Sequence, residues 1–339
     1  MRKIVVVIVV LAVSTFQYGW AQTASEMHAK AKSFMNQGDY DNATLIFGKL
    51  IEKEPTNTEY LKDLAFLSYL KRDFAKSIEL GKYLAEQPTA DVTTFQILAL
   101  AYKGIADAHN TKKVYKKALG KFPESGVLHC EYGEVLAEEK DLTAAINEWE
   151  QGIKTDANYS GNYFYAANYY TQTNQPFWVI MYGEVFVNLE SYTKRTATIK
   201  SLMLDAYKKL YLTTDFAKWI NDKKTTPFEK AIATLWSKSV ELSKNGLTPE
   251  SLTAIRTRFV LDYFQTNTHS TWPWSIFNLH QFFLKEGLFE AYNQWLFGAA
   301  NSTTAFQTWI ENHAKDAEAL TQYQRSRIFK MATNQYYKK

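Results

Sequence analysis

The chain of 339 residues has a single cysteine, Cys130, so it cannot form an intrachain disulfide. It also lacks a charge excess of either sign, because 39 Lys and Arg face 35 Asp and Glu, and no basic run exceeds three residues. A nucleic-acid-binding protein normally carries a basic stripe, so the sequence disfavours a nucleic-acid partner. Without disulfides, stability must come from apolar burial, for which 46% hydrophobic and 15% aromatic residues suffice.

Long hydrophobic runs are absent after the first residues. The one unbroken run, Ile4 to Val13, has ten residues, whereas a membrane-spanning helix needs about 20. It follows two basic residues and precedes Gly19-Trp20-Ala21, whose small residues suit a signal-peptide cleavage site. We therefore expect residues 1–21 to be a cleaved signal peptide and the mature chain to be exported, without a transmembrane segment, to the periplasm or outer envelope. Cys130 lies far from the cleavage site, so a lipoprotein is not expected.

The motifs that carry catalysis or cofactor binding are missing as well. The sequence has no G-x-x-x-x-G-K-[S/T] phosphate loop and no G-x-G-x-x-G turn. It has no G-x-S-x-G nucleophile elbow and no H-E-x-x-H zinc helix. We therefore predict a non-enzymatic protein with no catalytic residue, no cofactor and no metal site.

The histidines offer weaker alternatives. His129 adjoins Cys130, but neighbouring residues of a helix point about 100° apart and zinc needs three or four convergent ligands. As a catalytic nucleophile, the thiol would need a histidine base within reach, and a small buried thiol is the more ordinary interpretation. His269, His280 and Glu286 could act as an acid/base site only if the fold brought them into one cleft.

What the sequence does contain is a repeat. Five segments in the first half are spaced by 34 residues, beginning at Ala24, Thr58, Val92, Gly126 and Ser160. Small, aromatic and proline residues recur at equivalent places, most clearly Ala31, Phe34, Tyr40, Ala43, Phe47 and Pro55 in the first segment, Leu98, Ala99, Tyr102, Tyr115, Ala118 and Pro123 in the third, and Tyr132, Gly133, Leu142, Ala145 and Trp149 in the fourth. Five units in register are unexpected for an ordinary helical bundle.

Each segment has the features of a helix hairpin. Two antiparallel helices approach closely only where small side chains face each other, here Ala31 against Ala43 and Ala99 near Thr111. Turn signals such as 36–39 separate the two helices, and proline ends the second one. One hairpin cannot bury its own apolar face, so several must stack.

This pattern resembles the tetratricopeptide repeat (TPR) over residues 24–192. The resemblance implies an all-α fold, a right-handed superhelix of helix hairpins, and a protein or peptide partner in a concave groove lined by the first helix of each repeat. The family's groove positions correspond here to His28, Lys32, Met35, Lys62, Phe66, Tyr69, Gln96, Lys103, Glu134, Phe164 and Asn168.

The groove positions imply a mixed surface, positive toward the N-terminal repeats and apolar at Phe66 and Tyr69. TPR domains that bind chaperone C-termini use lysine and asparagine as a carboxylate clamp. In the first repeat His28 and Lys32 stand in those places, which disfavours that ligand.

Beyond the repeats the helical pattern continues without the period. We divide the chain into the signal peptide, a TPR array over 22–193 and a helical, aromatic-rich region over 194–339. Helices are predicted over 226–244, from an N-cap at Thr248 with Pro249 in the first turn, and over 302–314 and 316–332. Strand signals are almost absent. This region either caps the last repeat or folds back on it.

Trp272 and Trp274 flank a proline in this region. Exposed, they could stack on a sugar ring or grip a peptide; buried, they would form the core of a cap. The sequence thus favours an interaction scaffold of the cell envelope, and the alternative is a glycan- or small-ligand-binding protein that uses these C-terminal aromatics.

Overall fold

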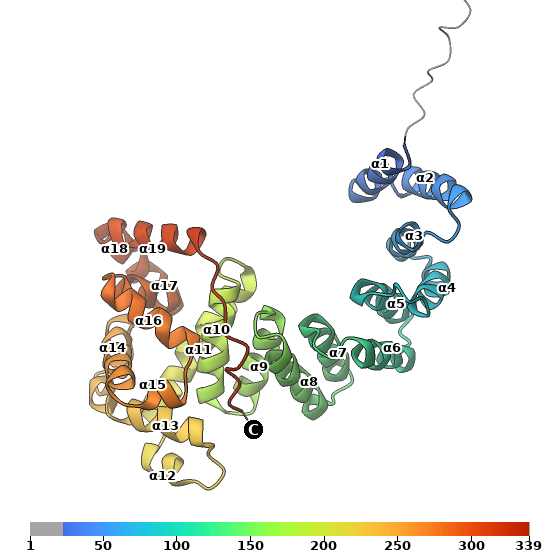
Figure 1. Cartoon of the computed structure of the whole chain (residues 1–339). Helices are drawn as coiled ribbons and strands as arrows, with labels where there is room; N and C mark the ends of the chain where they lie inside the picture. Colours follow the sequence, from blue (N-terminus) through green and yellow to red (C-terminus); the bar gives the residue numbers. More distant parts are fainter. Residues whose placement is uncertain (1–22, 339) are drawn as a thin grey trace, which may run out of the picture. The chain divides into compact units, whose positions relative to one another are not determined.

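The structure, a computed structural model, describes residues 23–338, and every regular element in that range is a helix (Figure 1). The expected signal peptide lies outside the described residues. None of the described helices combines the length and apolar character needed to cross a bilayer. The first ten helices are α1 (Ala24–Asn36), α2 (Tyr40–Lys53), α3 (Thr58–Leu70), α4 (Phe74–Ala85), α5 (Val92–Gly104), α6 (Ala108–Lys121), α7 (Gly126–Glu138), α8 (Leu142–Thr155), α9 (Ser160–Gln172) and α10 (Pro176–Leu189).

The predicted period is confirmed helix by helix. The odd-numbered helices α1 to α9 begin at the five residues that open the sequence segments, and the even-numbered helices follow at the same 34-residue spacing. In four of the hairpins an aspartate is the N-cap of the second helix: its side chain accepts a hydrogen bond from the backbone N–H of the residue three positions later. These N-caps are Asp39, Asp73, Asp107 and Asp141, and such a cap typically stabilises a helix by about 1 kcal/mol.

The turn inside each hairpin also repeats at this spacing. One residue per turn has a left-handed backbone, with φ between 56° and 79°, at positions 38, 72, 106, 140 and 174. This conformation ends a helix and favours glycine, yet only the first of these residues is Gly. Of the other four, Asn174 tolerates this backbone because its short polar side chain can bond locally. Arg72, Ala106 and Lys140 accept about 1–2 kcal/mol of local strain, so the hairpin geometry is imposed by the packing of the helices.

Close helix contacts explain the small residues. Ala31 and Ala43 are fully buried in one cluster with Phe47, as the sequence predicted. At Gly133, where α7 meets α8, an added β-carbon would lie 2.2 Å from the indole nitrogen of Trp149. No larger residue fits there without displacing the Trp149 indole.

The chain forms two compact units. The first ends at Lys116, inside α6, and the second begins at Lys117. The division therefore falls earlier than the end of the repeats. In the second unit α11 (Lys194–Thr213) packs against α9, α10 and α17, so the last repeats and the C-terminal region share one core.

The remaining helices all lie in the second unit. Among them α14 contacts both α16 and α17. They are α12 (Phe216–Asn221), α13 (Pro227–Ser237), the 3₁₀ turn η1 (Val240–Ser243), α14 (Pro249–Gln265), α15 (Thr268–Thr271), α16 (Ser275–Lys285), α17 (Phe289–Asn301), α18 (Thr303–Asn312) and α19 (Ala314–Ser326).

Two predicted helices are shorter than expected. The helix predicted over 226–244 ends at Ser237 and is followed by η1. From Lys238 on, the backbone N–H groups of Lys238, Ser239 and Leu242 donate to carbonyls three residues earlier, which is the 3₁₀ pattern and not the α-helical one. The helix predicted over 316–332 ends at Ser326. Thr248, by contrast, caps α14 through a capping box with Pro249 in the first turn, as predicted.

The last residues, 327–338, form no helix and include one turn at Thr333–Asn334. We call this segment the tail. Figure 1 shows it leaving α19 and running past α10 toward α9. The side-chain amide of Asn158 accepts from the backbone N–H of Met331 at 2.9 Å and donates to its carbonyl at 3.1 Å. Met331 is 3% exposed. The tail is thus a fixed part of the second unit.

Candidate functional site

The predicted groove residues of the first unit share one face. Helices α1, α3 and α5 are neighbours, because α3 contacts both of the others. We call the exposed side of these three helices the A-helix face. Met35, which the family pattern also places there, is instead buried at 8% exposure in the core of the first unit. The other predicted residues on this face are not buried: His28, Lys32, Lys62, Phe66, Tyr69, Gln96 and Lys103.

Acidic residues compensate the positive charge of this face. The Nε2 atom of His28 lies 2.6 Å from Asp63 Oδ2, and the Nζ atom of Lys32 lies 3.8 Å from the same oxygen. Lys62 donates to Asp91 at 2.6 Å. The expectation of a positive surface left out both aspartates. Asp63 adjoins a predicted groove lysine, and Asp91 is the N-cap of α5. Their positions in the sequence could therefore have indicated that acidic side chains neutralise the lysines of this face.

An aromatic pair forms the apolar part of the A-helix face. The rings of Phe66 and Tyr69 are stacked, with centroids 6.2 Å apart and an interplanar angle of 16°. Phe66 packs on the core of the unit, and Tyr69 contacts Phe74. Both side chains are half-buried. They are held in place from below while part of each remains accessible.

The predicted groove residues of the second unit are engaged within the protein. The guanidinium of Arg195 covers the ring of Phe164 at 4.8 Å, and Phe164 also packs on Phe186. Asn168 donates to the carbonyl of Phe164 in its own helix. Both residues are half-buried, as Phe66 and Tyr69 are, and their contacts lie within the second unit.

The two tryptophans beside Pro273 do not form an exposed platform. Trp274 is 1% exposed and packs near Phe228 and Tyr337. Trp272 is half-buried and meets the edge of Tyr337 at 5.3 Å. The core interpretation therefore applies to Trp274, because its indole has no face available for a sugar or a peptide.

The histidines do not come together in a cleft. His129 bonds Glu148 at 2.7 Å, and the thiol of Cys130 is buried, which raises its pKa and keeps it protonated. His269 in α15 bonds the carbonyl of Thr266, just before that helix, whereas His280 bonds Glu184. Within residues 23–338 no group of His, Cys, Asp and Glu side chains is arranged to hold a metal ion.

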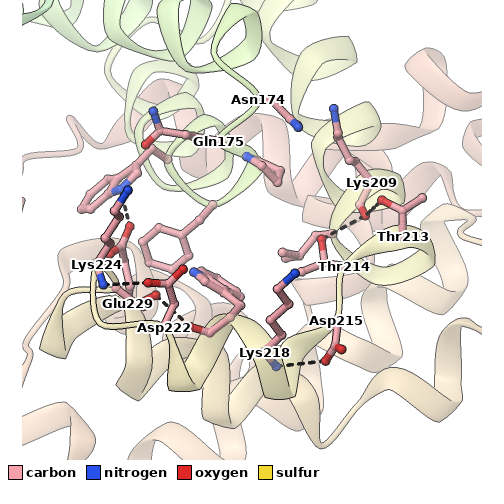
Figure 2. Close-up of a pocket in the computed structure, with 16 residues that line it drawn as sticks. Asn174, Gln175, Lys209, Thr213, Thr214, Asp215, Lys218, Asp222, Lys224 and Glu229 are labelled. Carbon is pink, nitrogen blue, oxygen red and sulfur yellow. Dashed lines mark hydrogen bonds between the residues drawn. The ribbon is translucent and has the colours of Figure 1, made fainter.

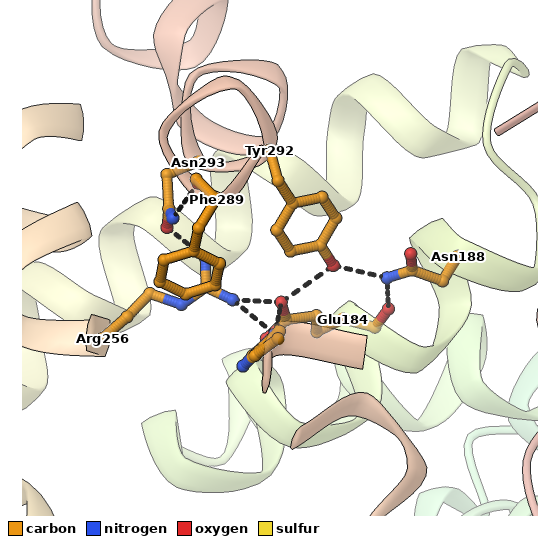
Figure 3. Close-up of polar contacts among 7 residues, drawn as sticks. Glu184, Asn188, Arg256, Phe289, Tyr292 and Asn293 are labelled. Carbon is orange, nitrogen blue, oxygen red and sulfur yellow. Dashed lines mark hydrogen bonds and ion pairs between the residues drawn. The ribbon is translucent and has the colours of Figure 1, made fainter. Parts of the chain in front are cut away.

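His280 belongs to a buried polar cluster that joins α10, α14, α16 and α17 (Figure 3). We define this cluster as Glu184, Arg256, His280, Tyr292 and Asn293. Arg256 donates to Glu184 and to Asn293. Tyr292 donates to the same Glu184 oxygen at 3.0 Å, and the Nε2 atom of His280 lies 2.7 Å from it.

The cluster keeps one ion pair in the interior. Burial alone would raise the pKa of Glu184, but the charge of Arg256 and the bond to His280 outweigh it and lower the pKa to about 2. Burial lowers the pKa of His280, so the ring stays neutral. The neighbouring cavity has a volume of about 10 Å³, which is about the space of a single water molecule. The cluster is therefore structural, because no substrate can reach it.

Three features of the first half coincide: helix starts every 34 residues, one left-handed turn residue per hairpin at the same spacing, and buried small residues where helices cross. The repeats are of the tetratricopeptide type.

No protein-family profile matches the chain. The human tetratricopeptide repeat protein 21B is 28% identical over 129 residues, which are 38% of this chain and 10% of that protein. The match thus spans a tenth of the human protein's length.

Solved TPR structures also resemble the chain. A TPR protein of Thermus thermophilus is 17% identical to the chain, with a TM-score of 0.43. Its superposition covers 54% of this chain and 100% of the Thermus chain. A TPR protein of Parabacteroides merdae is 15% identical, covers 71% of this chain and 91% of its own, and has a TM-score of 0.42.

A surface cavity of about 560 Å³ follows the last TPR hairpin (Figure 2). Phe177 and Trp219 line it, and their rings meet edge to face at 5.5 Å. Two of the carboxylates that line it accept hydrogen bonds from nearby backbone N–H groups. Asp215 accepts the N–H of Lys218, and Asp222 accepts that of Lys224. The rim thus carries charges of both signs, which gives no preference for an anion or a cation.

Proposed function

We propose that the protein is a non-enzymatic scaffold of the cell envelope that holds a protein partner on the A-helix face of its first TPR hairpins. The stacked pair of Phe66 and Tyr69 carries this proposal. Aromatic side chains that are rigid and partly accessible dominate protein interfaces energetically. This pair is fixed by the core beneath it and therefore loses little conformational freedom on binding.

The ion pairs around the aromatic pair are weak enough for contacts with a bound protein to replace them. Lys62 and Asp91 are partly exposed, with 26% and 47% of their side chains accessible. Such pairs contribute only about 0–1 kcal/mol, so a partner can replace them at low cost. Asp63 lies 2.6 Å from His28, and its negative charge disfavours a terminal carboxylate at that place. These features support an internal segment of a partner protein as the ligand.

The compartment is inferred from residues 1–21, which have the composition of a signal peptide. The protein recovered from the periplasmic or envelope fraction is expected to begin at Gln22, as N-terminal sequencing would determine. Full-length protein that begins at Met1 and remains in the cytoplasmic fraction would overturn the envelope assignment and leave the binding surface untouched.

Replacing Lys62, Phe66 and Tyr69 together by alanine is expected to abolish capture of the partner, because it removes the aromatic pair and one polar contact. The measurement is capture from envelope extract with the mature chain as bait, followed by quantification of each captured protein. A matched control replaces Leu45, Lys49 and Tyr83 by alanine. These residues lie on α2 and α4, outside the A-helix face, and Leu45 and Tyr83 are exposed.

The comparison of the two triple variants decides the proposal. The expected result is a partner that is retained by the wild type and the control and is lost, by about tenfold or more, with the A-helix variant. Equal retention by both variants would show that the A-helix face does not bind. Circular dichroism of both variants establishes that each remains helical.

A further inference from the structure

A second surface cavity, of about 450 Å³, lies where the tail leaves α19. Residues from the end of α10, from α16, from α19 and from the tail line it. Its volume falls within the range of about 300–1,000 Å³ that is usual for small-ligand sites. We call it the tail cavity.

The charged residues that line the tail cavity are all positive. They are Arg327 and Lys330, and no Asp or Glu lines the cavity. Within residues 23–338 neither side chain takes part in an ion pair. Arg327 is instead held over aromatic rings, with its guanidinium carbon 5.6 Å from the centroid of Phe282 and 5.4 Å from that of Tyr323. The cation is thus positioned at the cavity without a counter-charge.

An amide in the same wall lacks an acceptor. Gln324 lines the cavity, and its Oε1 atom accepts from the hydroxyl of Tyr192 at 2.9 Å. Its Nε2 atom is hidden from solvent and has no hydrogen-bond partner among the described residues. Buried donors without an acceptor are rare in native proteins and call for an explanation. A ligand in the cavity would satisfy this donor once the Gln324 amide turns toward it.

We propose that the tail cavity binds the carboxylate of a small aromatic acid. The carboxylate oxygens accept from Arg327 and Lys330, and from the N–H of Gln324 once its amide turns toward the cavity. The aromatic body lies against Leu279 and Phe329, which also line the cavity. A carboxylate matches this donor set because it can accept several charge-assisted hydrogen bonds at once. The acid is either a free small molecule or the C-terminal aromatic residue of a peptide.

Calorimetric titration of the mature chain with phenylacetate tests the proposal. Saturable binding is expected, and the neutral isostere phenylacetamide should bind at least about tenfold more weakly, because it lacks the charge. N-acetyl-phenylalanine and a tripeptide ending in phenylalanine distinguish the two sources. Tighter binding of the tripeptide points to a peptide C-terminus, and tighter binding of the free acids points to a small molecule.

Variants locate the binding. Lys330→Gln is expected to weaken phenylacetate binding about tenfold, and Lys315→Gln, an exposed lysine of α19 away from the cavity, to leave it unchanged. Gln324→Glu keeps the oxygen that accepts from Tyr192 but places a carboxylate beside the ligand, so it should abolish binding. Unchanged tryptophan emission shows that each variant is folded.

Three results would overturn the proposal. They are the absence of saturable binding for every acid at millimolar concentration, equal affinity for phenylacetate and phenylacetamide, and full affinity in the Lys330 and Gln324 variants. Each of these concerns the tail cavity alone, so none of them bears on the partner of the A-helix face.

Discussion

Replacing Arg256 by methionine is expected to lower the free energy of unfolding of the second unit by about 3–5 kcal/mol, because removing one partner of a buried ion pair leaves the other charge uncompensated. Arg256 is 2% exposed and donates to both Glu184 and Asn293. Its guanidinium also lies 5.4 Å from the ring of Phe297. Methionine has a similar length and keeps the apolar contacts, so the loss measures the charge.

Urea unfolding followed by tryptophan fluorescence measures this change. Every tryptophan within the described residues lies after Lys116, so the signal reports the second unit. Arg258→Met is the matched control. It lies two residues along the same helix, with 57% of its side chain exposed, and its pair with Asp262 should contribute no more than about 1 kcal/mol.

A second substitution separates charge from packing. Adding Glu184→Gln to Arg256→Met removes the unpaired charge but keeps an oxygen that accepts from Tyr292, so part of the lost stability should return. If the double variant is no more stable than Arg256→Met, the ion pair is not the source of the effect. A loss below about 1 kcal/mol in Arg256→Met would contradict the structural role of the whole cluster.

The repeats could be predicted from sequence because their determinants are local and periodic. Aspartate caps and small residues at helix crossings recur at the 34-residue spacing, and a proline follows the second helix of the first three hairpins, at Pro55, Pro88 and Pro123. Each of these determinants acts locally. The left-handed turn residues could not be predicted individually. Arg72 and Ala106 have no intrinsic preference for that backbone, and only the packing of the hairpin imposes it.

The candidate sites were less predictable, because their contacts join distant parts of the chain. Glu184 and Arg256 are 72 residues apart and Glu184 and His280 are 96 apart, and no repeat relates them. The same applies to Asn158 and Met331, which are 173 residues apart. On the A-helix face the lysines were found from the family pattern, whereas Asp63 was missed because it lies between two groove positions.

Removing the tail, by ending the chain after Ser326, is expected to destabilise the second unit by about 3–5 kcal/mol. The buried Met331 alone accounts for about 2–5 kcal/mol on the scale of core methionine truncations. The ring of Tyr337, whose centroid lies 4.7 Å from that of Phe228 and 5.3 Å from that of Trp272, adds about 0.5–1.5 kcal/mol.

The measurement is again urea unfolding, together with the tryptophan emission maximum of the folded protein. Truncation uncovers Trp272 and Trp274, so the emission should shift to longer wavelength before any denaturant is added. Unfolding at the same urea concentration with unchanged emission would show that the tail does not cover these residues in solution.

Point variants of Tyr337 identify what the tail contributes. Tyr337→Phe loses only the hydroxyl bond to the carbonyl of Pro273, a loss of about 1 kcal/mol, whereas Tyr337→Ala also removes the ring. A large difference between the two shows that aromatic packing holds the tail. Tyr336 in the same segment donates to Glu150 of α8, and Gln335 accepts from the backbone N–H of Ser275 at the start of α16 at 2.7 Å. With the contact between Tyr337 and Phe228 of α13, the tail joins the TPR hairpins to α13 and α16. The C-terminal region is thus bound to the repeats by its final residues as well as by α11.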